Sequence, residues 1–250
     1  MELLISERVP PERKEKTLRY FSSLISRAAE GLLVEVKGIS EEGGFIKMAI
    51  EGEDAEALAS FVKEKFGLAP MDLSSVEIGE ILKSFISGEK SEGGIEVELG
   101  AARLGRIKAF LPLSSLRAHL TRGESVSVEE IRRRYCLVEG FPLEVRVARL
   151  EGGKIVAELS DKQFFIFKEW RSLPFERLIV AGALMEEVKE GVEAANLEEI
   201  IITIEPLSLL VHSLICKLGF ASGPLASKLG EKLAGARVLA FSPTEVKVNR

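Results

Sequence analysis

Three consecutive arginines, Arg132, Arg133 and Arg134, are the residues of this sequence with the clearest chemistry. A guanidinium group carries its N–H donors in a planar fork that matches the oxygens of a phosphate. Successive residues of a helix lie about 100° apart, so three in a row fan over about 200° and cannot all be buried. The run therefore predicts either phosphate contacts or a solvated face on which the arginines pair with Glu129 and Glu130.

The arginine run lies in a positive region of an acidic chain. The 250 residues carry a formal net charge of −5. Residues 101–150 hold ten Lys and Arg against five Glu, a net of +5, so the rest of the chain carries −10. The ten are Arg103, Arg106, Lys108, Arg117, Arg122, Arg132, Arg133, Arg134, Arg146 and Arg149. A segregated charge distribution is informative about binding partners rather than about the fold, and here it indicates an acidic partner for the basic region.

Residues that could catalyse a reaction or hold a metal are sparse. His119 and His212 have no second His, Cys or Asp at metal-ligand spacing. Cys136 and Cys216 form no CxxC motif, and we expect two small buried residues in a reducing compartment rather than a disulfide or half of a metal site. The sequence contains no Ser-His-Asp set, P-loop or GxGxxG motif. We therefore expect a protein that is not an enzyme and that uses no metal or cofactor.

The basic region falls within a stretch that predicts a small barrel. Ile95, Val97 and Leu99 alternate with Glu96 and Glu98, which is the period of a strand with one buried face. Five strands are expected, over residues 77–86, 94–99, 106–113, 141–150 and 154–159. Glycine pairs and single glycines separate them where tight turns are needed. A five-stranded Greek-key barrel of this size is an OB-fold.

The flanking segments predict two further domains. Residues 1–70 read as β-α-β-β-α, most of a ferredoxin-like unit, with residues 68–75 as an exit linker or the missing strand. Residues 173–250 read as the complete β-α-β-β-α-β unit. The predicted fold class is α+β, with domains at 1–70, 71–172 and 173–250. The middle domain also holds an insertion, with a helix over 128–135 capped by Ser127, and an exit helix over 161–171.

Aromatic residues gather on the predicted exit helix. Phe164, Phe165, Phe167 and Trp170 give it a wide apolar face. This face is either a surface that binds a partner or the packing between two domains, and we favour packing because helix aromatics usually serve a core.

The barrel resembles the RNA-binding OB module first described in ribosomal protein S-one. The resemblance is carried by residues 105–114 (Gly-Arg-Ile-Lys-Ala-Phe-Leu-Pro-Leu-Ser), by 140–147 (Gly-Phe-Pro-Leu-Glu-Val-Arg-Val) and by 158–162 (Glu-Leu-Ser-Asp-Lys). In that family RNA bases stack on aromatic residues, whose positions here hold Gly93, Glu96 and Pro112. None of these supplies a π-face. Phe110, beside Lys108, is either a substitute for them or a residue that packs the barrel.

The chain as a whole is similar to an archaeal family, the domain-of-unknown-function family numbered 2110. The segments that carry this resemblance are residues 52–55, 130–135, 137–138 and 207–216. The resemblance implies an archaeal cytoplasmic protein linked to the transcription or translation machinery, and it implies no catalytic residues.

Together these observations predict a non-catalytic protein that binds RNA or a ribonucleoprotein through a basic face of the OB domain. The residues expected to carry this binding are Arg106, Lys108, Phe110, Arg117, Arg132, Arg133, Arg134 and Arg146. The alternative is a protein-interaction scaffold of the gene-expression machinery that does not touch RNA. No apolar run is long enough to span a membrane, and the first residues lack the pattern of a signal peptide, so we expect a cytoplasmic protein. The many Glu, Lys and Arg and few Asn and Gln suit a thermophile. The oligomeric state stays open.

Overall fold

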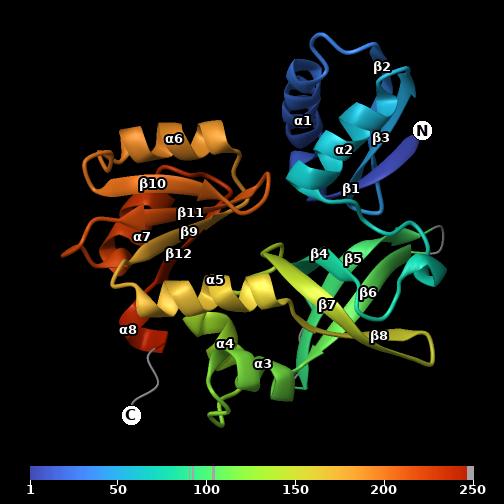
Figure 1. Ribbon diagram of the computed structural model, residues 1–250. Coiled ribbons are helices and arrows are strands. Elements are labelled where there is room, and N and C mark those ends of the chain that lie inside the picture. Colours follow the sequence, from blue (N-terminus) through green and yellow to red (C-terminus); the bar gives the residue numbers. More distant parts are fainter. Residues whose placement is uncertain (90, 92, 103–104, 247–250) are drawn as a thin grey trace.

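The computed structural model describes residues 1–89, 91, 93–102 and 105–246 of an α+β chain (Figure 1). Its strands form three sheets, and the middle one closes into a five-stranded barrel. Arg103, one of the ten basic residues counted above, lies outside the described residues. None of the helices within the described residues is long and apolar enough to cross a membrane.

The N-terminal sheet is antiparallel, in the order β1-β3-β2. It consists of β1 (Glu2–Arg8), β2 (Val34–Glu42) and β3 (Phe45–Gly52), and α1 (Lys14–Ala28) and α2 (Ala55–Phe66) pack on it. After α2 the chain returns to β1. There the N–H of Ser6 donates to the carbonyl oxygen of Gly67 at 3.1 Å, and the N–H of Ala69 donates to that of Leu4 at 2.8 Å. The segment expected to be a linker or a missing strand thus makes a short backbone pairing with β1.

The barrel consists of β4 (Ile81–Ile86), β5 (Gly94–Ala102), β6 (Gly105–Pro112), β7 (Pro142–Glu151) and β8 (Lys154–Leu159). Its strand order is β4-β5-β6-β8-β7, and β4 pairs with β7 to close it. The β6–β8 pair is parallel and the others are antiparallel. Ile95, Val97 and Leu99 are fully buried, as their alternation predicts. The five expected strands are therefore confirmed, with shifted ends.

The insertion between β6 and β7 forms two helices, α3 (Leu113–Leu120) and α4 (Val128–Arg134), where the sequence predicted only the second. Ser127 caps α4 as expected, because its side chain accepts the N–H of Glu130 at 3.1 Å. Directly after α4, the buried Tyr135 donates its hydroxyl to the carbonyl oxygen of Leu120 at 2.7 Å, which ties α4 to α3.

The exit helix α5 (Asp161–Ser172) runs between the barrel and the C-terminal sheet (Figure 1). Phe167 and Trp170 are buried, and their rings meet Tyr135 and Phe241 edge to face. This is the inter-domain packing that the sequence favoured for the aromatic residues. Phe165 is the exception, with 58% of its surface exposed.

The C-terminal sheet has the order β10-β11-β9-β12, with all pairs antiparallel. Its strands are β9 (Arg177–Ala181), β10 (Ile201–Pro206), β11 (Val211–Cys216) and β12 (Arg237–Phe241). The helices α6 (Met185–Ala194) and α7 (Ser222–Gly230) pack on one face, and a short α8 (Pro243–Val246) follows β12. Residues of the opposite face, including Ile179 and Phe241, join the core of the barrel and α5. The three sheets are thus packed against one another.

Candidate nucleic-acid interface

Lys108 on β6 and Arg132 on α4 meet at Glu89, in the loop between β4 and β5. The Nζ of Lys108 lies 2.5 Å from Oε1 of Glu89 and 2.7 Å from Oε1 of Glu96. Arg132 donates from Nη2 to the carbonyl oxygen of Glu89 at 3.4 Å. The hydrogen bond that Lys108 donates to Glu89 raises the pKa of Lys108 and lowers the pKa of Glu89. The third barrel strand and the insertion helix therefore contribute cations to one place, which we call the Glu89 cluster: Glu89, Glu96, Lys108, Phe110 and Arg132.

Arg132 is the least satisfied cation of this cluster. It is half-buried, and its Nε has no hydrogen-bond partner among the residues that the structure describes. Burial lowers its pKa, and the nearby Glu129 acts in the opposite direction. A guanidinium that has lost water without gaining a carboxylate is poised to accept an anion.

Phe110 lies two residues beyond Lys108, on the same outer face of β6. Its side chain is half-buried against the glycines at the start of β5. A Cβ on Gly94 would overlap the ring and the carbonyl oxygen of Leu111, so only glycine fits under the aromatic ring. Phe110 thus packs on the outside of the barrel and keeps part of its ring accessible.

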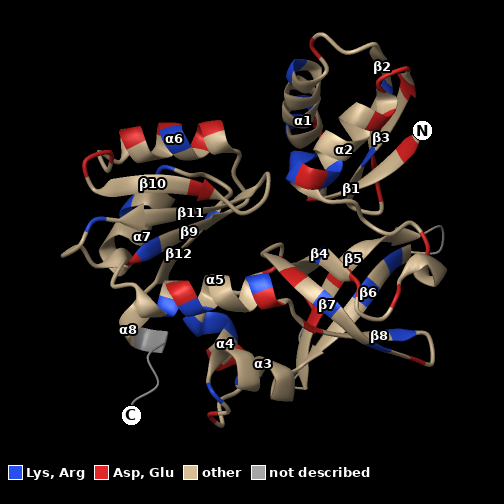
Figure 2. Cartoon of the chain, in the orientation of Figure 1, with Lys and Arg blue, Asp and Glu red and all other residues tan. Residues whose placement is uncertain are grey.

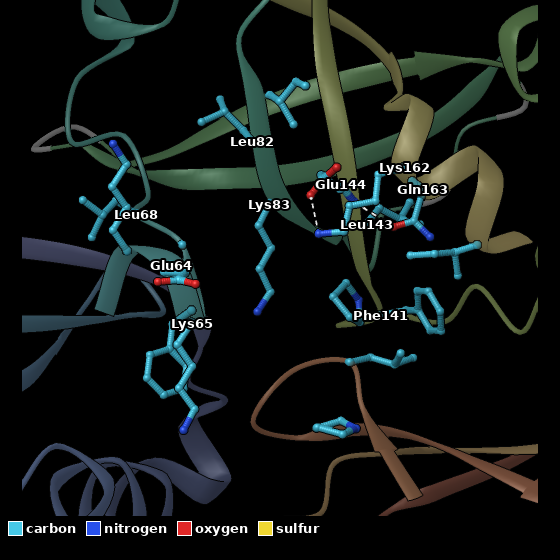
Figure 3. Close-up of a pocket in the computed structure, with 18 of the residues that line it drawn as sticks. Glu64, Lys65, Leu68, Leu82, Lys83, Phe141, Leu143, Glu144, Lys162 and Gln163 are labelled. Atoms are coloured by element: carbon cyan, nitrogen blue, oxygen red, sulfur yellow. Dashed lines mark hydrogen bonds and ion pairs between the residues drawn. The ribbon is translucent and has the colours of Figure 1, made fainter. Parts of the chain in front are cut away.

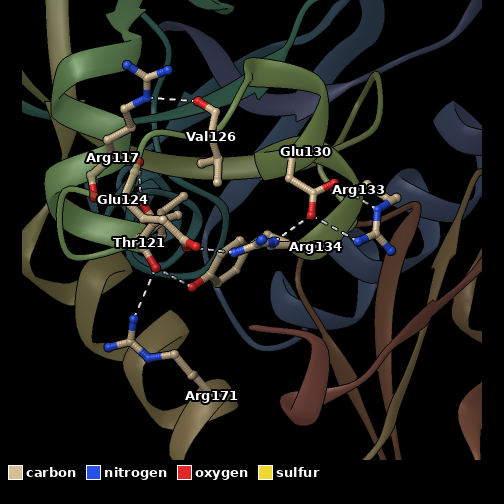
Figure 4. A network of polar contacts seen from close by, with 10 residues as sticks. Arg117, Thr121, Glu124, Val126, Glu130, Arg133, Arg134 and Arg171 are labelled. Atoms are coloured by element: carbon tan, nitrogen blue, oxygen red, sulfur yellow. Dashed lines mark hydrogen bonds and ion pairs between the residues drawn. The ribbon is translucent and has the colours of Figure 1, made fainter. Parts of the chain in front are cut away.

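Arg134 and Arg117 instead hold together the loop between α3 and α4 (Figure 4). Arg134 donates to Glu130 at 2.7 Å and to Glu124 at 3.0 Å, while the Nε of Arg117 donates to the carbonyl oxygen of Val126 at 2.8 Å. These contacts shape the loop and reduce the charge available to a ligand.

Arg133 shares the carboxylate of Glu130 with Arg134, at 3.0 Å (Figure 4). Hydrogen bonds, from Arg133 first and then Arg134, lower the pKa of Glu130 to about 2. The solvated, paired face that the sequence offered as one alternative therefore exists for these two arginines, with Glu130 and Glu124 as the acids.

Arg106 lies where the barrel meets the N-terminal sheet. Its Nη1 is 2.5 Å from Oε1 of the buried Glu98, and the Nε of Arg8, at the end of β1, is 3.4 Å from the other oxygen. Arg8 also approaches Glu139 at 3.6 Å. Arg8 is absent from the sequence-based set because nothing local links residue 8 to a barrel 90 residues away.

Arg146 lies apart from the other expected residues. It pairs with Glu158 on β8 at 3.0 Å and with Asp161, at the start of α5, at 3.6 Å. The expected binding residues therefore occupy four places: the Glu89 cluster with Arg133 beside it, the Arg106 junction, the loop held by Arg117 and Arg134, and the Arg146 pair. Acidic residues lie between the basic residues of the barrel, so the basic residues do not form one continuous patch (Figure 2).

A cleft of about 630 Å³ opens between α2, β4, β7 and α5 (Figure 3). Two of the four lysines that line it have an acid beside them: Lys83 pairs with the buried Glu7, and Lys162 lies 3.3 Å from Glu144. The side-chain oxygen of Gln163 accepts the N–H of Glu144 at 3.0 Å. Glu64 and Glu80 also line the cleft, so that four glutamates, counting Glu7, face its four lysines.

His212 and both cysteines are buried. His212 is buried, its Nε2 lies 2.9 Å from the carbonyl oxygen of Ala183, and burial lowers its pKa. Cys136 and Cys216 are buried and form no disulfide, and burial raises the pKa of Cys216 to about 11, so its thiol is a poor nucleophile. Within the described ranges, no three His, Cys, Asp or Glu side chains are grouped as a metal ion would need.

Two family models match the chain. The DUF2110 central domain matches residues 76–171, and the DUF2110 C-terminal domain matches residues 175–241. Together they cover about two thirds of the sequence and include the barrel, its insertion, α5 and the C-terminal sheet. A search of curated proteins found no match.

Proposed function

This chain belongs to the DUF2110 family, and from that premise we propose that it is a non-catalytic protein that binds RNA or a ribonucleoprotein in transcription or translation. The proposed contact surface is the Glu89 cluster, with Arg133 beside it. It replaces the wider face expected from the sequence, because Arg117, Arg134 and Arg146 are engaged in other contacts.

The proposal treats the barrel as an S-one-like OB domain and the flanks as ferredoxin-like domains, with boundaries near residues 70 and 172. The order β4-β5-β6-β8-β7, with its single parallel pair β6–β8, supports the OB assignment. The order β10-β11-β9-β12 in a β-α-β-β-α-β chain supports the C-terminal assignment, and β1-β3-β2 is the same arrangement without its fourth strand.

One observation carries the proposal: Lys108 and Arg132, 24 residues apart, converge beside a partly accessible Phe110. A lysine supplies a point charge and an arginine a planar fork, and both suit phosphate oxygens. An aromatic ring beside them offers a face on which a base can stack without regard to its identity. We therefore expect little base preference and a preference for single strands.

The salt dependence of binding tests the electrostatic part. On single-stranded RNA each phosphate contact contributes about −0.7 to the slope of log affinity against log salt concentration. Two engaged contacts, from Lys108 and Arg132, give a slope of about −1.4. Fluorescence anisotropy with a labelled 20-nucleotide oligouridine, titrated between 50 and 200 mM salt, measures this slope on the full chain.

The matched experiment compares Lys108→Gln/Arg132→Gln with Arg149→Gln. Arg149 is on the same barrel, on β7, with 63% of its side chain exposed and its Nε 3.3 Å from Oε1 of Glu151. We expect the double variant to bind RNA at least tenfold more weakly, with a salt slope smaller in magnitude by about 1.4, and Arg149→Gln to bind like wild type. Circular dichroism of each variant verifies that the barrel remains folded.

A wild-type protein that binds no RNA at 50 mM salt would overturn the proposal. The interaction-scaffold alternative would then take its place, and the density of ion pairs over the barrel supports that alternative. The acidic helix α6, which carries four glutamates and one lysine, is the surface it would present to a basic partner (Figure 2). Recovery of a partner protein after nuclease treatment of the extract would then be the expected result.

A further inference from the structure

A groove lined by arginines from all three sheets crosses the junction where the sheets meet. Its inner part, of about 210 Å³, is lined by Arg8, Arg106, Ser208 and Arg237, among other residues. Its outer part, of about 420 Å³, is lined by Arg132, Arg133 and again Arg237. Glu139 and Arg237 line both parts, so the two parts adjoin at these side chains. We call this the junction groove.

Arg237, the first residue of β12, is its central cation. It is exposed, and it forms no ion pair with any residue that the structure describes. Its position between the two parts places its guanidinium within reach of a ligand in either. Neither the arginine run nor the basic window of the sequence pointed to it, because it comes from the otherwise acidic C-terminal third.

The other arginines are only partly neutralised. Arg8 and Arg106 share the one carboxylate of Glu98, and the second acid near Arg8, Glu139, lies 3.6 Å away with 46% of its side chain exposed. At the outer end, Arg132 keeps its Nε without a partner among the described residues. Five arginines, Arg8, Arg106, Arg132, Arg133 and Arg237, thus face four nearby glutamates, Glu12, Glu98, Glu130 and Glu139, a net of +1 on a chain of net charge −5.

Phosphate is the ligand group that matches these donors. Guanidinium forks bind phosphate oxygens with paired, charge-assisted hydrogen bonds, and several forks suit several phosphate oxygens. Ser208 adds a hydroxyl to the inner wall. The inner part is smaller than the pockets that enclose drug-sized ligands, so it suits a phosphate group better than a whole cofactor.

We propose that the junction groove binds phosphate groups and extends the RNA-binding surface from Arg132 across the domain junction to Arg237, Arg106 and Arg8. The inference rests on the proposed function for the source of its ligand, a phosphodiester chain leaving the Glu89 cluster. A free phosphate is the other source of the same chemistry. In either case the site exists only while the three sheets keep their arrangement, since each contributes an arginine.

Two variants with opposite expected effects test the groove. Arg237→Gln removes an exposed cation without leaving a buried acid unpaired, and it should weaken oligouridine binding several-fold and reduce the magnitude of the salt slope by about 0.7. Glu139→Gln removes a competing acid and should strengthen binding several-fold. A gain of affinity cannot result from misfolding, so the second variant keeps the test decisive. Arg149→Gln, outside the groove, serves as the control and should bind like wild type.

The outcomes separate the groove from the proposed function. If wild type binds RNA, Lys108→Gln/Arg132→Gln loses binding, and both Arg237→Gln and Glu139→Gln behave like wild type, the groove is refuted and the proposed function stands. If wild type binds no RNA, the proposed function fails, and inorganic phosphate and pyrophosphate become the probes. A rise in melting temperature with either anion in wild type, absent in Arg237→Gln, supports a groove for free phosphate. No rise in wild type refutes the groove as well.

Discussion

The carboxylate of Glu7, on β1, pairs with the ammonium of Lys83, on β4, while its second oxygen accepts the backbone N–H of Leu209 at 2.9 Å. Glu7 is buried on the N-terminal sheet, and its two partners come from the barrel and from the loop between β10 and β11. One side chain therefore connects all three parts of the chain. A second link, from Arg13 to Glu187 at 2.8 Å, joins the N-terminal part directly to α6. The junction groove depends on the arrangement that these contacts stabilise.

Lys83→Met should destabilise the protein by about 3 kcal/mol, because removal of one partner leaves the other charge buried without compensation. The lysine is 22% exposed, which places the expected loss at the low end for buried pairs. The midpoint of urea unfolding, followed by circular dichroism, measures it.

Lys162→Met is the matched control for Lys83→Met. Lys162 pairs with Glu144 but is 73% exposed, so we expect a loss below about 1 kcal/mol. Equal losses in the two variants would contradict the role assigned to Glu7.

Tyr135→Phe should cost only about 1 kcal/mol, whereas Tyr135→Ala should cost about 3–5 kcal/mol. The carbonyl oxygen of Leu120 loses the tyrosine hydroxyl in the first variant but keeps Arg171, which donates to it at 3.0 Å (Figure 4). The second variant also removes the ring that packs on Phe167. Thermal unfolding measures both changes. Tyr20→Phe removes the hydroxyl of a half-buried tyrosine that makes no side-chain hydrogen bond among the described residues, and it should leave the melting temperature unchanged.

Stability should fall with acidification below about pH 6.5 in part through His212. Burial lowers the pKa of this histidine below its ordinary value of 6.5, so the unfolded chain takes up the proton first. The contribution of His212 is complete above the unfolded pKa and is lost as the pH falls toward the folded pKa. Each unit of pKa depression corresponds to about 1.4 kcal/mol.

The comparison of wild type with His212→Gln isolates this effect. Glutamine retains an N–H for the carbonyl oxygen of Ala183 but does not titrate. The difference between the urea midpoints at pH 7.5 and pH 5.5 should be smaller for the variant than for wild type. An identical pH dependence in the two proteins would show that His212 does not contribute.

Glu130→Gln should strengthen RNA binding if the arginines of α4 contact phosphates. The substitution releases Arg133 and Arg134 from the acid that both now share, and the surface position limits the loss of stability to below about 1 kcal/mol. Glu129→Gln removes the same net charge from the same helix, but Glu129 makes no hydrogen bond to either arginine within the described residues. Anisotropy should show a larger gain for Glu130→Gln than for Glu129→Gln, and equal gains would mean that only net charge matters.

Much of the barrel could be predicted from local sequence. The alternation of Ile95, Val97 and Leu99 with glutamates predicts a strand whose apolar side faces inward. The glycines between the strands predict the turns. Ser127 predicted the start of α4, because a capping side chain bonds to an N–H in the first turn of its own helix. The helix α3 gave no such signal, since Pro112 at its N-terminus makes no side-chain cap and only Leu116 and Leu120 among its eight residues are buried.

The sequence by itself determined the types of the elements, their order and the excess of basic residues in the second half of the barrel, because these depend on residues close together in the chain. Only the tertiary structure decided which charges meet. Glu7 reaches Lys83 across 76 residues, and Arg237 joins Arg8 across 229, through the packing of whole sheets. The same packing gave most of the expected arginines an acid and left Arg132 and Arg237 without one in the described structure. The order of charges along the chain does not show which charged side chains lie close together in the folded protein.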